Sequence, residues 1–219
     1  MTWQMGLFFG SIAFVGSHFL MSHPLRAPLV RKMGEGPFRG LYSLVSLVLF
    51  GLMIWSYHRL GREEMLWQPS EAMWIAGAVL MWIGSILFVG SFVGNPALPG
   101  APRPKRRAPG GVLAITRHPM MWGFALWGIV HLMLVAMMKA IVFDAAIIIL
   151  ALVGSVLQDL KKRALMGQDW HDWTARTAFV PFTRGLANPG AIALVGGTLL
   201  FLVATWFHPV PAGLWRWID

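Results

Sequence analysis

The sequence predicts an all-α, polytopic membrane protein, with six transmembrane helices in one domain over residues 1–219. Of its 219 residues, 57% are hydrophobic and only 12% are charged, whereas a soluble domain is about one quarter charged. The charges gather in short segments, and the apolar runs between them are long enough to cross a bilayer, which takes about 20 residues per helix. The lipid bilayer is therefore the first partner that the sequence predicts.

Six apolar runs fit this length. The first lacks a basic leader and a small-residue cleavage motif, so we expect a retained span and not a signal peptide. Only Lys139 separates the fourth run from the fifth, which favours a tight helical hairpin. The predicted spans are residues 3–22, 38–58, 72–94, 119–138, 140–158 and 190–208.

The basic residues orient these spans. If both termini lie outside, all but four of the 18 Lys and Arg residues fall in the inner loops, as the positive-inside rule requires. The four outside are Arg59, Arg62, Lys139 and Arg216. The net charge of +9 thus reflects topology, and no signature of nucleic-acid binding accompanies it. The Pro-rich, basic segment 95–111 is predicted to be an irregular cytoplasmic connector that faces lipid headgroups.

Two of the seven histidines stand out by depth. His18 lies about a turn inside the first span and His131 about 18 Å beyond Pro119 in the fourth, where an imidazole is costly unless it has a function. With no cysteine in the chain, two imidazoles from two apolar helices suit haem better than zinc or a di-iron centre. Their depths differ, however, and pairing His18 with His118 would ease the mismatch, so the residues alone leave the pair open.

Three ordered motifs resemble the NnrU family of bacterial membrane proteins. They are GSHFLMSHPLR at 16–26, GEGPFRGLYSLVS at 34–46 and ITRHPMMWGFALWGIVH at 115–131. The resemblance extends from the first span through VPF at 180–182 and implies an NnrU-type domain in the bacterial inner membrane. It also implies an association with denitrification and nitric oxide metabolism.

The 15-cis-zeta-carotene isomerases are similar in the same motifs. They hold haem b between two axial histidines, which fall on His18 and His131 here, so the resemblance implies haem b as cofactor and an apolar polyene such as a carotenoid as substrate. A further histidine and a cysteine of those isomerases have no counterpart here, since Trp or Gly (Gly128) occupies the position of the cysteine. Haem binding is therefore expected to transfer more readily than isomerase activity.

Basic residues near the inner face are candidate partners for the haem propionates, which need cations in a low-dielectric site. They are Arg26, Arg39 and Arg117, and His118 joins them as a candidate cofactor-binding residue at the mouth of the fourth span. Alternatively, these arginines only satisfy the positive-inside rule. Glu35 is expected to pair with Arg31 or Arg39 in a modest surface contact.

A more distant resemblance links RHPMMWG (117–123) and GQDWHDWTARTAFVPF (167–182) to isoprenylcysteine and phospholipid methyltransferases. Those enzymes use an acidic pair beside S-adenosylmethionine, whereas here Asp159 is followed by Leu160 and Lys161. Three functions remain as expectations: a haem-dependent cis–trans isomerase, a non-enzymatic accessory or sensor protein of nitric oxide metabolism, and a methyltransferase that uses S-adenosylmethionine.

Overall fold

The computed structural model describes residues 2–104 and 108–218, and every regular element in these ranges is helical. The predicted all-α class is thus confirmed. The elements are α1 (Trp3–Ser22), α2 (Arg26–Met33), α3 (Glu35–Arg59), α4 (Glu71–Gly90), α5 (Val112–Ile115), α6 (Pro119–Leu134), α7 (Met138–Met166), α8 (Gln168–Arg176), α9 (Ala191–Trp206) and the short 3₁₀ helix η1 (Gly213–Trp217).

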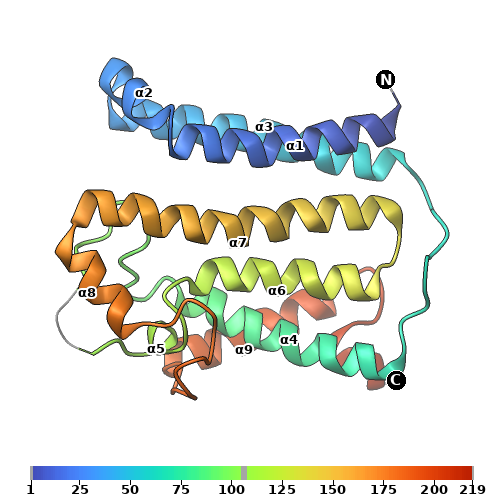
Figure 1. The fold of residues 1–219 in the computed structure, drawn as a ribbon. Helices are drawn as coiled ribbons and strands as arrows, with labels where there is room; N and C mark the ends of the chain where they lie inside the picture. Colours follow the sequence, from blue (N-terminus) through green and yellow to red (C-terminus); the bar gives the residue numbers. More distant parts are fainter. Residues whose placement is uncertain (1, 105–107, 219) are drawn as a thin grey trace.

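The long helices run side by side, with α7 in the middle (Figure 1). On one face of α7 packs α1, which in turn carries α3; on the other face packs α6, followed by α4 and then α9. Helix α7 therefore separates α1 and α3 on one side from α6, α4 and α9 on the other. Any site that joins α1 to α6 must reach across that helix.

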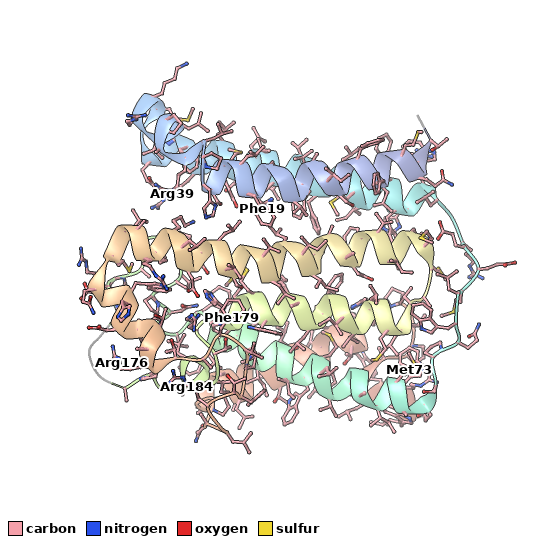
Figure 2. All side chains as sticks on the ribbon, viewed as in Figure 1. Phe19, Arg39, Met73, Arg176, Phe179 and Arg184 are labelled. Carbon is pink, nitrogen blue, oxygen red and sulfur yellow. The ribbon has the colours of Figure 1, made fainter. Side chains whose placement is uncertain are left out.

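The two ends of the bundle differ in composition. Both chain termini lie at one end, which we call the terminal end and which also holds Met73 (Figures 1 and 2). The opposite end, which we call the loop end, holds the short helices α2, α5 and α8 together with Arg39. Because both termini lie at the same end, the chain runs along the bundle an even number of times, which agrees with the six predicted spans.

The apolar helices match the six predicted spans in position. Four of them, α1, α3, α4 and α7, are long and apolar enough to cross a membrane. The other two, α6 and α9, are apolar but have 16 residues each, a rise of about 24 Å against a hydrocarbon core of about 30 Å. The chain is a helical protein whose apolar helices suit a bilayer.

The junction between α6 and α7 differs from the prediction that Lys139 alone separates two spans. The break falls earlier, over residues 135–137, where the backbone leaves helical geometry. There the Ala136 carbonyl accepts a hydrogen bond from Leu66 N at 2.7 Å. Lys139 lies in the first turn of α7, and its ammonium donates to the carbonyl of Gly61. The 60–70 connection therefore caps this hairpin.

The short helices at the loop end were not predicted. The sequence marks α8 only weakly, because its residues are polar on average, yet Trp170 and Trp173 are buried and form a core with Leu113 and Ala97. The predicted absence of helix in 95–111 is confirmed where the chain is described, and residues 105–107 lie outside that range.

Glycines let the central helices approach closely. A Cβ at Gly128 of α6 would lie 2.7 Å from Ile148 Cγ1 of α7, and one at Gly197 of α9 would lie 2.4 Å from Ile86 Cα of α4. Helix α7 thus fills the space beside Gly128. Close helix contacts at small residues are typical of membrane bundles.

Candidate functional site

Helix α6 begins in a buried polar cluster at the loop end. Pro119 takes the first position of α6, where its missing N–H costs no hydrogen bond. Just before it, the Arg117 guanidinium donates to Asp159 Oδ2 of α7 from Nε at 2.9 Å and from Nη2 at 2.7 Å. The His118 side chain is fully buried, with Nε2 at 2.9 Å from Asp159 Oδ1. We call Arg117, His118, Gln158 and Asp159 the loop-end cluster.

The side chains of α7 engage both ring nitrogens of His118. Its Nδ1 lies 3.2 Å from Gln158 Oε1, while the Gln158 amide nitrogen donates to the Ala97 carbonyl at 2.9 Å. Its Nε2 lies 2.9 Å from Asp159 Oδ1. The Asp159 carboxylate thus faces both Arg117 and His118.

The same cluster holds the segment that follows α8. Arg117 donates from its backbone N to the Ala178 carbonyl at 2.9 Å and from Nη1 to the Thr177 carbonyl at 3.2 Å. The ring of Phe179 packs against both basic side chains. Its centroid lies 5.2 Å from the Arg117 guanidinium carbon and 5.3 Å from the centroid of the His118 ring. Because both ring nitrogens of His118 lie within hydrogen-bond distance of α7 side chains, this histidine ties the start of α6 to α7.

The other two predicted cationic partners form a separate group at the loop end. Arg26 donates to both oxygens of Glu35 at 2.8 and 3.0 Å, and Arg39 donates to Oε1 at 3.2 Å. Glu35 therefore pairs with Arg39, one of the arginines expected from the sequence, and also with Arg26. One carboxylate is shared by two arginines, which leaves one net positive charge.

His18 lies between α1 and α3. Its Nδ1 is 2.7 Å from the Phe14 carbonyl one turn earlier, so Nδ1 carries the proton and Nε2 is an acceptor. Nε2 is 3.3 Å from Ser46 Oγ, whose own hydroxyl also lies 2.8 Å from the Tyr42 carbonyl. The rings of Phe14 and Tyr42 pack against the imidazole edge-on. His18 is thus a half-buried imidazole in an aromatic surrounding, on the α1–α3 side of α7.

His131 lies on α6 near the terminal end. Its Nδ1 is 2.8 Å from the Trp127 carbonyl one turn earlier, which leaves Nε2 as the free lone pair. The Trp127 ring packs against the imidazole with centroids 4.1 Å apart. His208, beyond the end of α9, places its ring centroid 6.1 Å from that of His131, and its Nδ1 lies 3.1 Å from the Val210 carbonyl.

The structure does not bring His18 and His131 together. His23 Nε2 lies 2.9 Å from the Leu157 carbonyl of α7, and the His118 ring contacts Gln158 and Asp159, so these two histidines meet α7 at nearly the same level. Toward the terminal end, His18 lies five residues from His23 and His131 lies thirteen residues from His118. These offsets correspond to about 7.5 and 20 Å at 1.5 Å per residue. The depth difference foreseen in the sequence therefore persists, at about 12 Å, and α7 lies between the two helices (Figure 1).

Two residues of interest were missed in the sequence. One is His208, because nothing in its neighbourhood in the sequence indicates that it meets His131. Asp144 is 3% exposed within the apolar helix α7; it carried a readable signal, since a lone carboxylate in a span is a candidate functional group by default. Its backbone carbonyl lies against Gly128 of α6.

Within the described ranges, no three His, Cys, Asp or Glu residues gather closely enough to hold a metal ion by themselves. The NnrU protein family matches residues 6–215, nearly the whole chain. No curated protein and no solved structure matches the chain. The motifs that resembled the family, 16–26 in α1 and 115–131 in α5 and α6, lie in the helices that carry the buried imidazoles, and the chain belongs to the NnrU family.

Proposed function

We propose that this NnrU protein binds haem b and that His131 is an axial ligand of the iron. The observation that carries the proposal is the hydrogen bond from His131 Nδ1 to the Trp127 carbonyl. Histidines that bind metals usually donate their second ring nitrogen in this way, which fixes the tautomer and aims the other nitrogen at the metal. An imidazole in an apolar helix without a ligand would be costly to bury.

The residues fit a haem in their chemistry, because the chain has no thiolate and its spans offer neutral imidazoles. The pair His18 and His131, implied by the resemblance to the carotene isomerases, would require these side chains to close a depth difference of about 12 Å. We therefore propose His131 as one ligand of the haem iron and leave the second ligand unassigned in this proposal.

We also propose that all six apolar helices cross the bacterial inner membrane, with the terminal end outside. The loop end carries Arg26, Arg39 and Arg117 and the other basic loops, as expected for the cytoplasmic side. In this orientation His131 lies near the outer surface. The loop-end cluster lies about 20 Å away along α6, too far to contact a haem bound at His131.

Bound haem would supply an iron that exchanges electrons or binds a small ligand. The protein's part is to hold the ring in apolar surroundings and to set how easily one axial position opens. An isomerase acting on an apolar polyene and a sensor of nitric oxide would both need an iron that a further molecule can reach, whereas an accessory role in electron transfer would not.

A methyltransferase is not supported by a specific observation. The Asp159 carboxylate, which would have to receive the amine of S-adenosylmethionine, already accepts hydrogen bonds from Arg117 and His118. Lys162, one turn later, donates to the carbonyls of Pro96 and Leu98 and brings a further positive charge. This surrounding would repel a cationic cofactor.

The test is to express the protein with a haem precursor, purify it in mild detergent, and measure haem content and the oxidised and reduced visible spectra. We expect stoichiometric haem in the wild type and loss or a large spectral change in His131→Ala. His58→Ala is the matched control, since His58 is an exposed histidine at the end of α3. A colourless wild type that elutes as a folded species, or an unchanged spectrum in His131→Ala, would refute the proposal.

A further inference from the structure

The connection between α1 and α2 meets the loop end of α7, and this contact brings basic side chains together. His23 Nε2 donates to the Leu157 carbonyl of α7 at 2.9 Å. Arg26 follows His23 by three residues, and Lys161 follows Leu157 by four. The Lys161 ammonium is accordingly within electrostatic reach of Arg26 and of Glu35. The fold thus places positive charges of α2 and α7 on either side of one seam.

Glu35 is the carboxylate that the cations of this seam share. Arg26 donates to both of its oxygens, at 2.8 and 3.0 Å, and Arg39 donates to Oε1 at 3.2 Å. Arg39 lies at the loop end of the bundle (Figure 2). We call Arg26, Arg39 and Lys161 the basic seam. Its three cations around one carboxylate leave two net positive charges.

The basic seam keeps N–H donors that the described part of the chain does not use. Both hydrogen bonds from Arg26 to Glu35 start from Nη2, and the one from Arg39 starts from Nε. Within residues 2–104 and 108–218, no acceptor is found for Arg26 Nη1, for either Nη atom of Arg39 or for Lys161 Nζ. Lys162, one residue later, differs, since its ammonium donates to two backbone carbonyls.

The two arginines are held in place and are still accessible. The Arg26 guanidinium carbon lies 5.7 Å from the centre of the buried Phe38 ring. The side chains of Arg26 and Arg39 are 30% and 55% exposed. Oriented guanidinium and ammonium donors with no acceptor of their own suit a phosphate group, which offers several charged oxygens at once.

Apolar side chains flank the basic seam directly. Leu25, beside Arg26, is 43% exposed, and Leu160, beside Lys161, is 53% exposed. A basic group between membrane helices, with exposed apolar side chains next to it, fits a phospholipid that has its headgroup on the cations and its acyl chains along the helices.

We propose that the basic seam binds the phosphate of an anionic phospholipid and that this lipid joins α2 and α3 to α7. The phosphate offsets part of the repulsion between Lys161 and the arginines across the seam. The inference rests on the membrane setting of the proposed function, with the loop end at a headgroup layer. It does not depend on haem binding.

The experiment compares lipid-depleted wild type with Lys161→Gln and the control Lys32→Gln in mild detergent. Phosphatidylglycerol or zwitterionic phosphatidylcholine is added, thermal unfolding gives the melting temperature, and native mass spectrometry gives the affinity for each lipid. At about a hundredfold excess over its Kd, phosphatidylglycerol should raise the melting temperature of the wild type by about 5–10 °C. Phosphatidylcholine should leave it nearly unchanged.

The two variants remove the same charge from different places. Lys161→Gln should weaken phosphatidylglycerol binding about tenfold, because a hydrogen bond to a charged group is lost. Without lipid it should be at least as stable as the wild type, since Lys161 donates to no described residue and Arg26 repels it. Lys32 is exposed on α2 and lies outside the basic seam, so Lys32→Gln should weaken binding less than about fivefold.

Four results would overturn the inference: equal stabilisation of the wild type by both lipids, phosphatidylglycerol affinity that is unchanged in Lys161→Gln, a lower melting temperature of lipid-free Lys161→Gln, and equal stabilisation by millimolar inorganic phosphate, which would assign a free anion to the site. If Lys161→Gln does not fold, Arg39→Gln decides, with the same tenfold loss expected and an unchanged affinity as the contrary result. Haem content is not a readout here, so colourless protein that selects phosphatidylglycerol would refute haem binding alone.

Discussion

Replacing Asp159 by Asn removes the only carboxylate of the loop-end cluster while keeping the shape of the side chain. In the wild type this carboxylate accepts two hydrogen bonds from Arg117, at 2.7 and 2.9 Å, and one from His118, at 2.9 Å. The side chains of Arg117 and Asp159 are each 13% exposed and that of His118 is fully buried. The variant would leave the buried Arg117 guanidinium without its anion and His118 without its carboxylate partner.

Removing one partner of a buried ion pair costs about 3–5 kcal/mol of unfolding free energy, because the remaining charge stays desolvated and unpaired. For a chain of this length, each kcal/mol lowers the melting temperature by about 2–4 °C, so the expected decrease is about 6–20 °C. The measurement is thermal unfolding in mild detergent, followed by circular dichroism and by loss of the monodisperse elution peak.

The matched control is Asp169→Asn, which breaks an ion pair of the same type on the surface. Asp169 accepts from Arg103 at 2.6 Å, but the two side chains are 38% and 68% exposed. Exposed pairs contribute about 0.2–1 kcal/mol, so this variant should lose no more than about 4 °C. If Asp159→Asn melts within the range of Asp169→Asn, the loop-end cluster does not anchor α6, and its buried charges are compensated in some other way.

Four further variants test the packing and the Glu35 ion pairs by the same thermal unfolding measurement. Gly197→Ala places a Cβ 2.4 Å from Ile86 Cα, a backbone atom, and should lower the free energy of unfolding by about 1–3 kcal/mol. Its control is Gly16→Ala, whose Cβ meets no atom within 4 Å and which should be neutral or slightly stabilising. Equal melting temperatures of the two variants would contradict the close approach of α4 and α9. Glu35→Gln, whose arginine partners are partly exposed, should cost no more than about 1 kcal/mol, and a larger loss would indicate a role beyond surface pairing. Trp170→Ala, which empties a fully buried position, should cost about 3–5 kcal/mol, and a stability close to the wild type would show that α8 is not packed as described.

The sequence alone determined the six apolar helices of the fold but neither all of their ends nor the short helices between them. Apolar runs of membrane length predict the six apolar helices, because burying an unpaired peptide group in lipid is so costly that such runs must be helical. The sequence could not predict that α6 would end before residue 135, because that break depends on the connection over residues 60–70, which hydrogen bonds to it. Nor could it predict α8, whose two buried tryptophans have a partner surface only once α5 and the 95–98 turn are in place.

For the site, the sequence determined which side chains were unusual, and the tertiary structure decided which of them meet. An intramembrane imidazole can be recognised from its neighbours in the chain, so His18 and His131 were identified by burial cost alone. The separation of His18 and His131 could not be predicted from the sequence, because their depths depend on where each helix begins and on which helix lies between them. The order in which helices pack on α7 places His131 beside His208, 77 residues later, and joins His118 to Asp159. Such contacts depend on how the whole chain folds, so no local sequence pattern predicts them.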